Sequence, residues 1–132
     1  MSEQLAVCKA LGALFSKHGD PSEAEVNFVA NAAMELGLTA EQNEEVMGVL
    51  KDGGDYGALL GGVQSKALRT FLFRRVVAAT LIDEQIEDSE LATIHETAGA
   101  FGFDKGAVDE YLKWMEEGIA WEKRGVELMA KL

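Results

Sequence analysis

Apolar side chains recur at helical spacing along most of the chain, and no segment shows the strict alternation that is typical of a strand. Five glycines between residues 51 and 62 interrupt this pattern, which predicts a flexible connector there with one helical turn around 56–60. The pattern predicts helices over about 3–17, 20–36, 39–50, 64–83, 88–100 and from 104 towards the end of the chain. We therefore expect an all-α fold of six to seven helices.

The helical pattern occurs twice, with an offset of 65 residues. Residues 18–46 and 83–111 align without a gap, and each copy consists of an acidic loop, a helix, a glycine stop and a second helix. Identical residues pair at four positions, which are Glu25 with Glu90, Ala33 with Ala98, Gly37 with Gly102, and Glu45 with Glu110. We expect a single domain over 1–132 with an internal pseudo-twofold repeat, its halves lying at about 5–53 and 68–118.

Helix starts are indicated by residues that can cap them. Two capping boxes overlap before the second helix, Asp20 with Glu23 and Ser22 with Glu25, and the sequence leaves open which one forms. Thr39 is expected to cap the third helix in the same way.

The apolar stripes also predict the core. The helix over about 64–83 is the most apolar and is expected at the centre of the fold. Cys8 lies on an apolar face of the first helix and is expected to be a small core residue. The stripes of three later helices place four further residues in the core: Leu72, Val76, Ile94 and Leu112.

The charge of the chain is strongly negative, with 23 acidic against 12 basic residues and a net charge of -11. Phosphate recognition requires clustered Lys and Arg, so we expect no nucleic-acid partner. No apolar run approaches the roughly 18 residues that a membrane span needs. The amino terminus does not resemble a signal peptide, and the single cysteine agrees with a reducing compartment, so a cytoplasmic location is expected.

Acidic residues gather before the second and fifth helices. They can simply cap the helices and oppose the positive end of the helix dipole. They can also bind a divalent cation such as Ca²⁺, Mn²⁺ or Zn²⁺, because carboxylate oxygens are hard ligands and an imidazole suits a transition metal. Under the second interpretation, equivalent positions of the two repeats form one metal site across the pseudo-twofold: His18, Glu25, Asp83 and Glu90.

The same acidic segments carry a resemblance to a known family. The segment IDEQIEDSEL, residues 82–91, resembles the ADGEISPEEL-type segment of the TerB-like (tellurite resistance) family, and KHGDPSEAEV, residues 17–26, occupies the matching place in the first half. Asp83, Ile86 and Glu90 match the motif, whereas His18 stands at the position of its aspartate in the first half. The resemblance implies an all-helical cytoplasmic bacterial domain with acidic metal-binding surfaces. It also implies a role in stress or tellurite response that depends on binding and not on catalysis.

Signatures of common enzyme sites are missing from the sequence. The glycine-rich segment lacks the lysine and hydroxyl of a phosphate-binding loop, and there is no HExxH motif. We therefore predict a non-catalytic interaction module of TerB type. The alternative is a metal-responsive version of that module.

The last helix carries a second apolar stripe. Trp114, Trp121 and Leu128 recur every seven residues, with Gly118 and Gly125 between them. This surface either packs against the first helix or contacts a protein partner, with a homodimer through Trp121 and Leu128 as one form of that contact.

Overall fold

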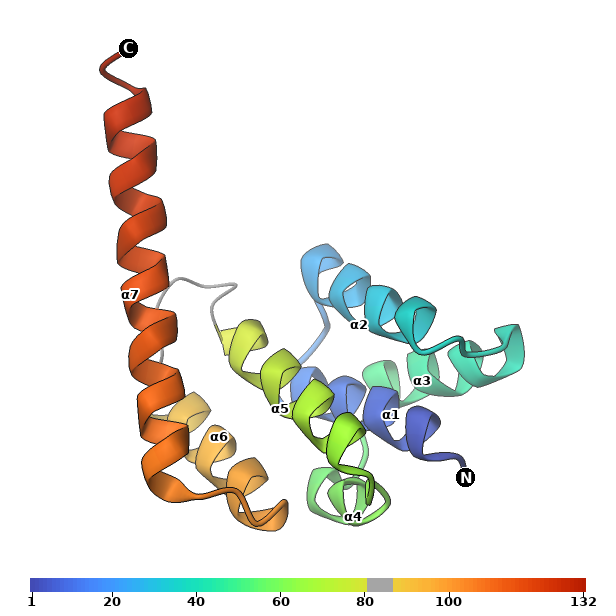
Figure 1. Ribbon diagram of the computed structural model, residues 1–132. Coiled ribbons are helices and arrows are strands. Elements are labelled where there is room, and N and C mark those ends of the chain that lie inside the picture. The colour runs from blue at the N-terminus through green and yellow to red at the C-terminus, as the bar shows by residue number, and fades with distance from the viewer. Residues whose placement is uncertain (81–86) are drawn as a thin grey trace. The chain divides into compact units, whose positions relative to one another are not determined.

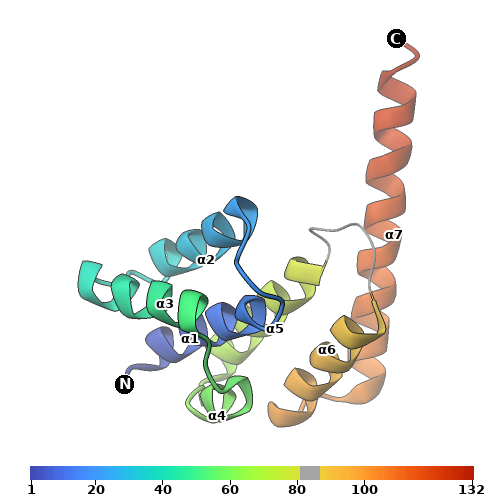
Figure 2. The same ribbon diagram turned by 180° about the vertical axis from the view of Figure 1, so that it is seen from behind.

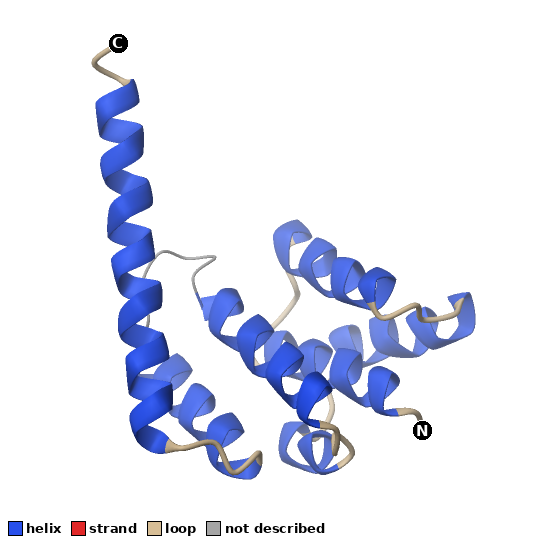
Figure 3. Cartoon of the chain, viewed as in Figure 1, coloured by secondary structure: helices blue, strands red, loops and turns tan. Residues whose placement is uncertain are grey.

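The structure is a computed structural model that describes residues 1–80 and 87–132 (Figures 1 and 3). Across these ranges it contains helices and no strand, which confirms the all-α prediction. The helices are α1 (Glu3–Ser16), α2 (Glu23–Glu35), α3 (Ala40–Asp52), α4 (Tyr56–Gly61), α5 (Lys66–Thr80), α6 (Asp88–Ala100) and α7 (Lys105–Met129). They belong to two compact units, residues 1–101 and 102–132. Two sequence-based expectations, the acidic Asp83 and the apolar Ile86, lie outside the described residues.

Local capping chemistry sets the starts of the helices. Ser22 caps α2 and forms the capping box with Glu25, in which the Ser22 Oγ accepts from the Glu25 backbone N–H and the Glu25 carboxylate accepts from that of Ser22. Thr39 and Gln42 form the same box at α3. The Asp104 carboxylate caps α7 by accepting from the third residue beyond it, at 3.0 Å. Each cap satisfies a backbone N–H that the helix itself leaves without a partner.

Helix α1 is the central element of the first unit. It contacts α2, α3, α4 and α5 (Figures 1 and 2), and ten of its 14 residues are buried. Small side chains permit this burial: a Cβ added at Gly12 would lie 3.3 Å from the backbone nitrogen of Leu50, so α1 and α3 approach closely there. The expectation that the helix over 64–83 is central was wrong, because α1 is apolar or small on nearly every side, whereas α5 exposes charged residues such as Arg74.

The glycine-rich connector contains α4, which is fastened to α6 by a buried hydrogen bond. The hydroxyl groups of Tyr56 and Thr97 lie 2.6 Å apart, and both side chains are buried. The Nζ of Lys17 lies 4.8 Å from the centroid of the Tyr56 ring. One helical turn was expected around Tyr56, but its anchoring role was not.

The predicted core residues are buried. Leu72, Val76 and Ile94 are fully buried, and Leu112 is buried on α7. Cys8 is also fully buried, as expected for a small core residue, and burial raises the pKa of its thiol to about 11.

The bounds of the helices follow the sequence repeat. Helix α6 begins and ends 65 residues after α2, and α7 begins 65 residues after α3. The glycines after α2 and α6, Gly37 and Gly102, share a φ of +70°, a conformation that glycine adopts without strain. A pseudo-twofold relation between the two halves in space stays a prediction.

Helix α7, with 25 residues, makes up most of the second unit. Val108 and Leu112 are its buried residues, whereas every residue from Ala120 to Leu132 is exposed. Neither α7 nor any other helix within the described ranges is long and apolar enough to cross a membrane.

Candidate functional site: an acidic cavity in the first unit

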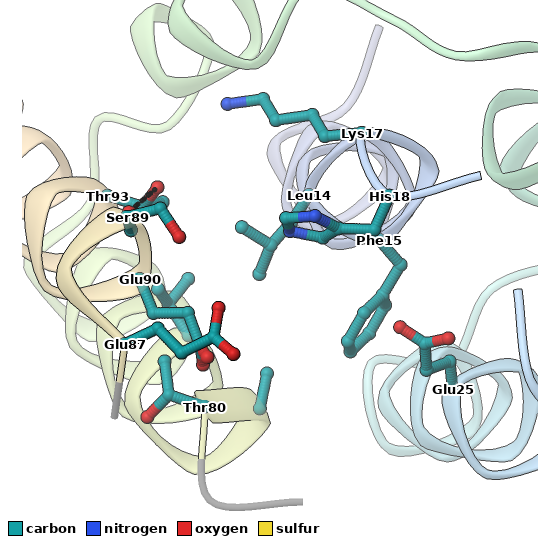
Figure 4. Close-up of a pocket in the computed structure, with 12 residues that line it drawn as sticks. Leu14, Phe15, Lys17, His18, Glu25, Thr80, Glu87, Ser89, Glu90 and Thr93 are labelled. Carbon is teal, nitrogen blue, oxygen red and sulfur yellow. Dashed lines mark hydrogen bonds between the residues drawn. The ribbon is translucent and has the colours of Figure 1, made fainter. Parts of the chain in front are cut away.

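A cavity of about 220 Å³ opens in the first unit, where the end of α1, the first turn of α2, the end of α5 and the start of α6 come together (Figure 4). Its residues come from segments that are far apart in the sequence. They are Leu14, Phe15, Lys17, His18, Glu25, Val76, Ala79, Thr80, Glu87, Ser89, Glu90 and Thr93. The cavity therefore joins the two acidic segments that the sequence singled out.

One part of the lining is apolar and belongs to the core. Leu14 and Phe15 come from the last turn of α1, and Val76 and Ala79 come from α5. Phe15 is held by the ring of Phe28 on α2, which meets it edge-on with the ring centroids 5.7 Å apart. These side chains give the cavity an apolar surface.

Carboxylates stand on two sides of the cavity. Glu87 and Glu90 lie at the start of α6, and Glu25 lies in the first turn of α2 on the opposite side (Figure 4). Glu87 is the N-cap residue of α6, but its side chain makes no capping hydrogen bond, unlike that of Ser22 at the equivalent position of α2. Its carboxylate extends towards the cavity instead (Figure 4).

Two basic residues follow the end of α1. The imidazole of His18 extends from the end of α1 towards the side of the cavity where Glu87 and Glu90 lie, and the Lys17 chain runs above it in the view of Figure 4. The backbone turns here because the N–H of His18 donates to the carbonyl of Phe15 at 3.2 Å, and Gly19 follows with a φ of +97°. The turn places His18 at the cavity while the Lys17 ammonium contacts the Tyr56 ring.

Three of the four predicted metal ligands line this one cavity: His18, Glu25 and Glu90. The fourth, Asp83, lies outside the described residues. One Glu25 oxygen accepts a hydrogen bond from the Ser22 backbone N–H at 2.8 Å. This carboxylate therefore takes part in capping α2, which is the structural role that the sequence also allowed for it. Nowhere in residues 1–80 and 87–132 do three or more His, Cys, Asp or Glu side chains form a group that could hold a metal ion. The four-residue site therefore stays a prediction.

The sequence did not single out Glu87 as a site residue. Its position immediately before α6 could have drawn attention to it, because capping positions favour Ser, Thr, Asp and Asn, and a glutamate there is unusual. A glutamate there has a longer side chain that can extend past the helix end. The apolar lining from α1 and α5 had no local signal, since it forms only when these helices meet.

The arrangement suits a ligand that has an apolar stem and a cationic end. The apolar surface can cover methylene groups, and the carboxylates at α6 can accept hydrogen bonds from an ammonium or guanidinium group. Lys and Arg side chains have both parts.

The two segments that carry the resemblance to the TerB-like family also supply most of the polar lining. Residues 17–26 contribute Lys17, His18 and Glu25, and residues 82–91 contribute Glu87, Ser89 and Glu90. In comparisons with known proteins, no family model matches the chain, and neither a curated protein nor a solved structure matches it.

Proposed function

We propose that this protein is a non-catalytic, cytoplasmic interaction module of TerB type that acts in stress or tellurite response and binds a basic side chain of a protein partner in the acidic cavity. The observation that carries the proposal is the cavity itself, which Glu87 and Glu90 line together with apolar side chains such as Phe15 and Val76. A single site thus offers contacts to both parts of a lysine or arginine side chain.

The charge of the whole chain supports the same partner chemistry. A net charge of -11 attracts basic surfaces from a distance and repels acidic ones. Such attraction raises the rate of association with a basic partner, and the local carboxylates then select the side chain that enters.

The test uses N-acetyl-lysine amide and N-acetyl-arginine amide as probes, followed by backbone amide chemical shifts. We expect both probes to shift the resonances of His18, Glu87 and Glu90 in a saturable way. N-acetyl-norleucine amide has a similar stem without the charge and should cause much smaller shifts. Equal shifts with all three probes would contradict the proposal, because the carboxylates would then contribute nothing to recognition.

Variants locate the site. Glu87→Gln with Glu90→Gln removes two negative charges at the cavity and should weaken binding of both cationic probes by about tenfold or more. Glu41→Gln with Glu44→Gln removes the same charge from exposed positions on α3 and serves as the control. If both double variants weaken binding equally, the effect is one of total charge and the cavity is not the site.

The alternative is a divalent cation bound by His18, Glu25, Asp83 and Glu90. The observation in its favour is that three of these residues line one cavity. Ion binding would stabilise the fold by RT ln(1 + [L]/Kd), or about 2.7 kcal/mol at roughly 100 times Kd. Calorimetric titration with Ca²⁺, Mn²⁺ and Zn²⁺ tests this: Asp83→Asn with Glu90→Gln should abolish the heat. The absence of both heat and a melting shift at millimolar ion would rule out the metal.

We also propose that the two halves of the module are related by a pseudo-twofold axis. The matching bounds of α2 and α6, and the matching starts of α3 and α7, support this. An experimentally determined structure in which the pair α2–α3 superposes poorly on the pair α6–α7 would contradict it.

A further inference from the structure

Helix α7 exposes a line of alternating large and small residues. Trp114 and Trp121 are 64% and 74% exposed, and Leu128 continues the line one heptad further on. Gly118 and Gly125 lie between them on the same side of the helix, since steps of three and four residues stay on one face. A Cβ built at either glycine meets no other atom within 4 Å, so each glycine leaves an open notch in this line.

We infer that α7 pairs in antiparallel orientation with α7 of a second copy of this chain, each tryptophan filling a glycine notch of the other copy. The spacing of the tryptophans and glycines along α7 allows both of their pairs to form in one register. When Trp121 lies opposite Gly118 of the second copy, Trp114 lies opposite Gly125. The twofold axis repeats both pairs, so four successive layers each combine a large residue with a small one.

The charged residues that flank this line independently favour the antiparallel pair. Glu110, Glu117, Arg124 and Lys131 follow one edge of it at intervals of seven residues. In the antiparallel register, Glu117 faces Arg124 of the second copy and Glu110 faces Lys131, so all four symmetry-related pairs have opposite charge. Such flanking pairs set the orientation of paired helices.

A parallel pair lacks these matches. In that orientation each tryptophan would lie beside the same tryptophan of the second copy, and glycine would lie beside glycine, leaving voids. Glu117 would also approach Glu122 of the second copy, which has the same charge. Both the sizes and the charges therefore favour the antiparallel pair.

The contact is of the size expected for a reversible dimer. Four tryptophan side chains at about 150–250 Å² each cover roughly 600–1,000 Å², to which Leu128 adds a further apolar side chain. Specific interfaces bury about 1,200 Å² or more in total. We therefore expect a dimer that dissociates on dilution, and this surface lies on a different element from the acidic cavity.

The test is sedimentation velocity over a wide range of protein concentration, with paired charge reversals. The parent should shift from monomer to dimer as its concentration rises. Glu117→Arg and Arg124→Glu should each weaken the dimer by about tenfold or more, because each brings like charges together at two symmetry-related places. An equimolar mixture of the two variants should restore dimerisation, since positions 117 and 124 of one variant then carry charges opposite to those that they face on the other.

Two further variants separate pairing from folding. Lys123→Glu makes the same charge change as Arg124→Glu, but Lys123 lies on the side of α7 that faces away from the line of Trp114 and Trp121. This variant should leave the dimer unchanged. Gly118→Leu fills the notch and should abolish the dimer, while circular dichroism shows equal or greater helicity because glycine is a poor helix former.

Three outcomes would overturn the inference. The parent could stay monomeric at every concentration, or Gly118→Leu could dimerise as well as the parent. A dimer that tightens on Glu117→Arg would show a parallel pair, because that change removes the repulsion from Glu122.

Discussion

The hydrogen bond between Tyr56 and Thr97 has a direction that its neighbours determine. The Thr97 hydroxyl donates its single hydrogen to the carbonyl of Thr93 at 2.8 Å. It can therefore only accept from the Tyr56 hydroxyl, which must be the donor. Burial raises the pKa of the Tyr56 phenol to about 12, which keeps this donor protonated.

Removing that donor should destabilise the protein. Tyr56→Phe leaves the Thr97 oxygen without its incoming hydrogen bond in a buried place, which should lower the free energy of unfolding by about 1–2 kcal/mol. Denaturant unfolding of Tyr56→Phe, Thr97→Val and the double variant measures it. The double variant should lose less than the sum of the two single losses, because the groups are coupled. Simple additivity would show that the hydroxyl groups do not interact.

At the scale of elements, features with local causes could be predicted. The capping residues Thr39 and Asp104 lie immediately before the helices that they cap, and the bounds of α6 agree with the prediction to the residue. The central position of α1 could not be predicted from local sequence features. Its apolar face is visible in the sequence, but the burial of small residues such as Ala6 depends on neighbours that arrive from distant segments.

A contact between the starts of α1 and α5 also lacked a local signal. One carboxylate oxygen of Glu3 accepts from the backbone N–H groups of Gln64 and Ser65, at 2.5 and 2.8 Å. These hydrogen bonds, first that from Ser65, lower the pKa of Glu3 below its ordinary value of 4.5. The ionised carboxylate thus fastens two helix starts that are about sixty residues apart in the sequence.

This contact predicts a particular dependence on pH. Because the folded state lowers the pKa of Glu3, the stabilisation is present above the unfolded pKa and is lost as pH falls through the folded one. Glu3→Gln should therefore have a lower melting temperature than the parent at neutral pH. The difference in melting temperature should shrink as pH falls below 4.5. Glu41→Gln, an exposed glutamate in the first turn of α3, is the control. A difference that stays constant with pH would mean that ionisation is not involved.

For the molecule as a whole, the core of the first unit should govern stability. Leu72 is fully buried on α5, and Leu72→Ala should lower the free energy of unfolding by about 2–5 kcal/mol through lost burial and the cavity left behind. Leu91 on α6 is 36% exposed and provides the same chemical change outside the core. Leu91→Ala should lower it by less than about 1 kcal/mol. Denaturant melts that give equal losses for the two variants would contradict this ranking.

The candidate site could be predicted only in part. His18, Glu25 and Glu90 follow from the repeat, because equivalent positions in two copies suggested that the two segments come together. The apolar lining from Leu14 and Val76 required knowledge of how α1 meets α5, which periodicity within either helix does not contain.

The C-terminal end of α7 is exposed, so its helical order depends on whether another surface packs against it. From Ala120 onward no residue is buried, so this stretch is held by its own backbone hydrogen bonds. A helix of about a dozen residues is marginal in water when nothing packs against it, and a glycine such as Gly125 lowers its intrinsic stability by about 1 kcal/mol relative to alanine. Helix formation and attachment to a second copy would then be thermodynamically linked, each shifting the population of the other. Warming that frays this end would also separate the copies.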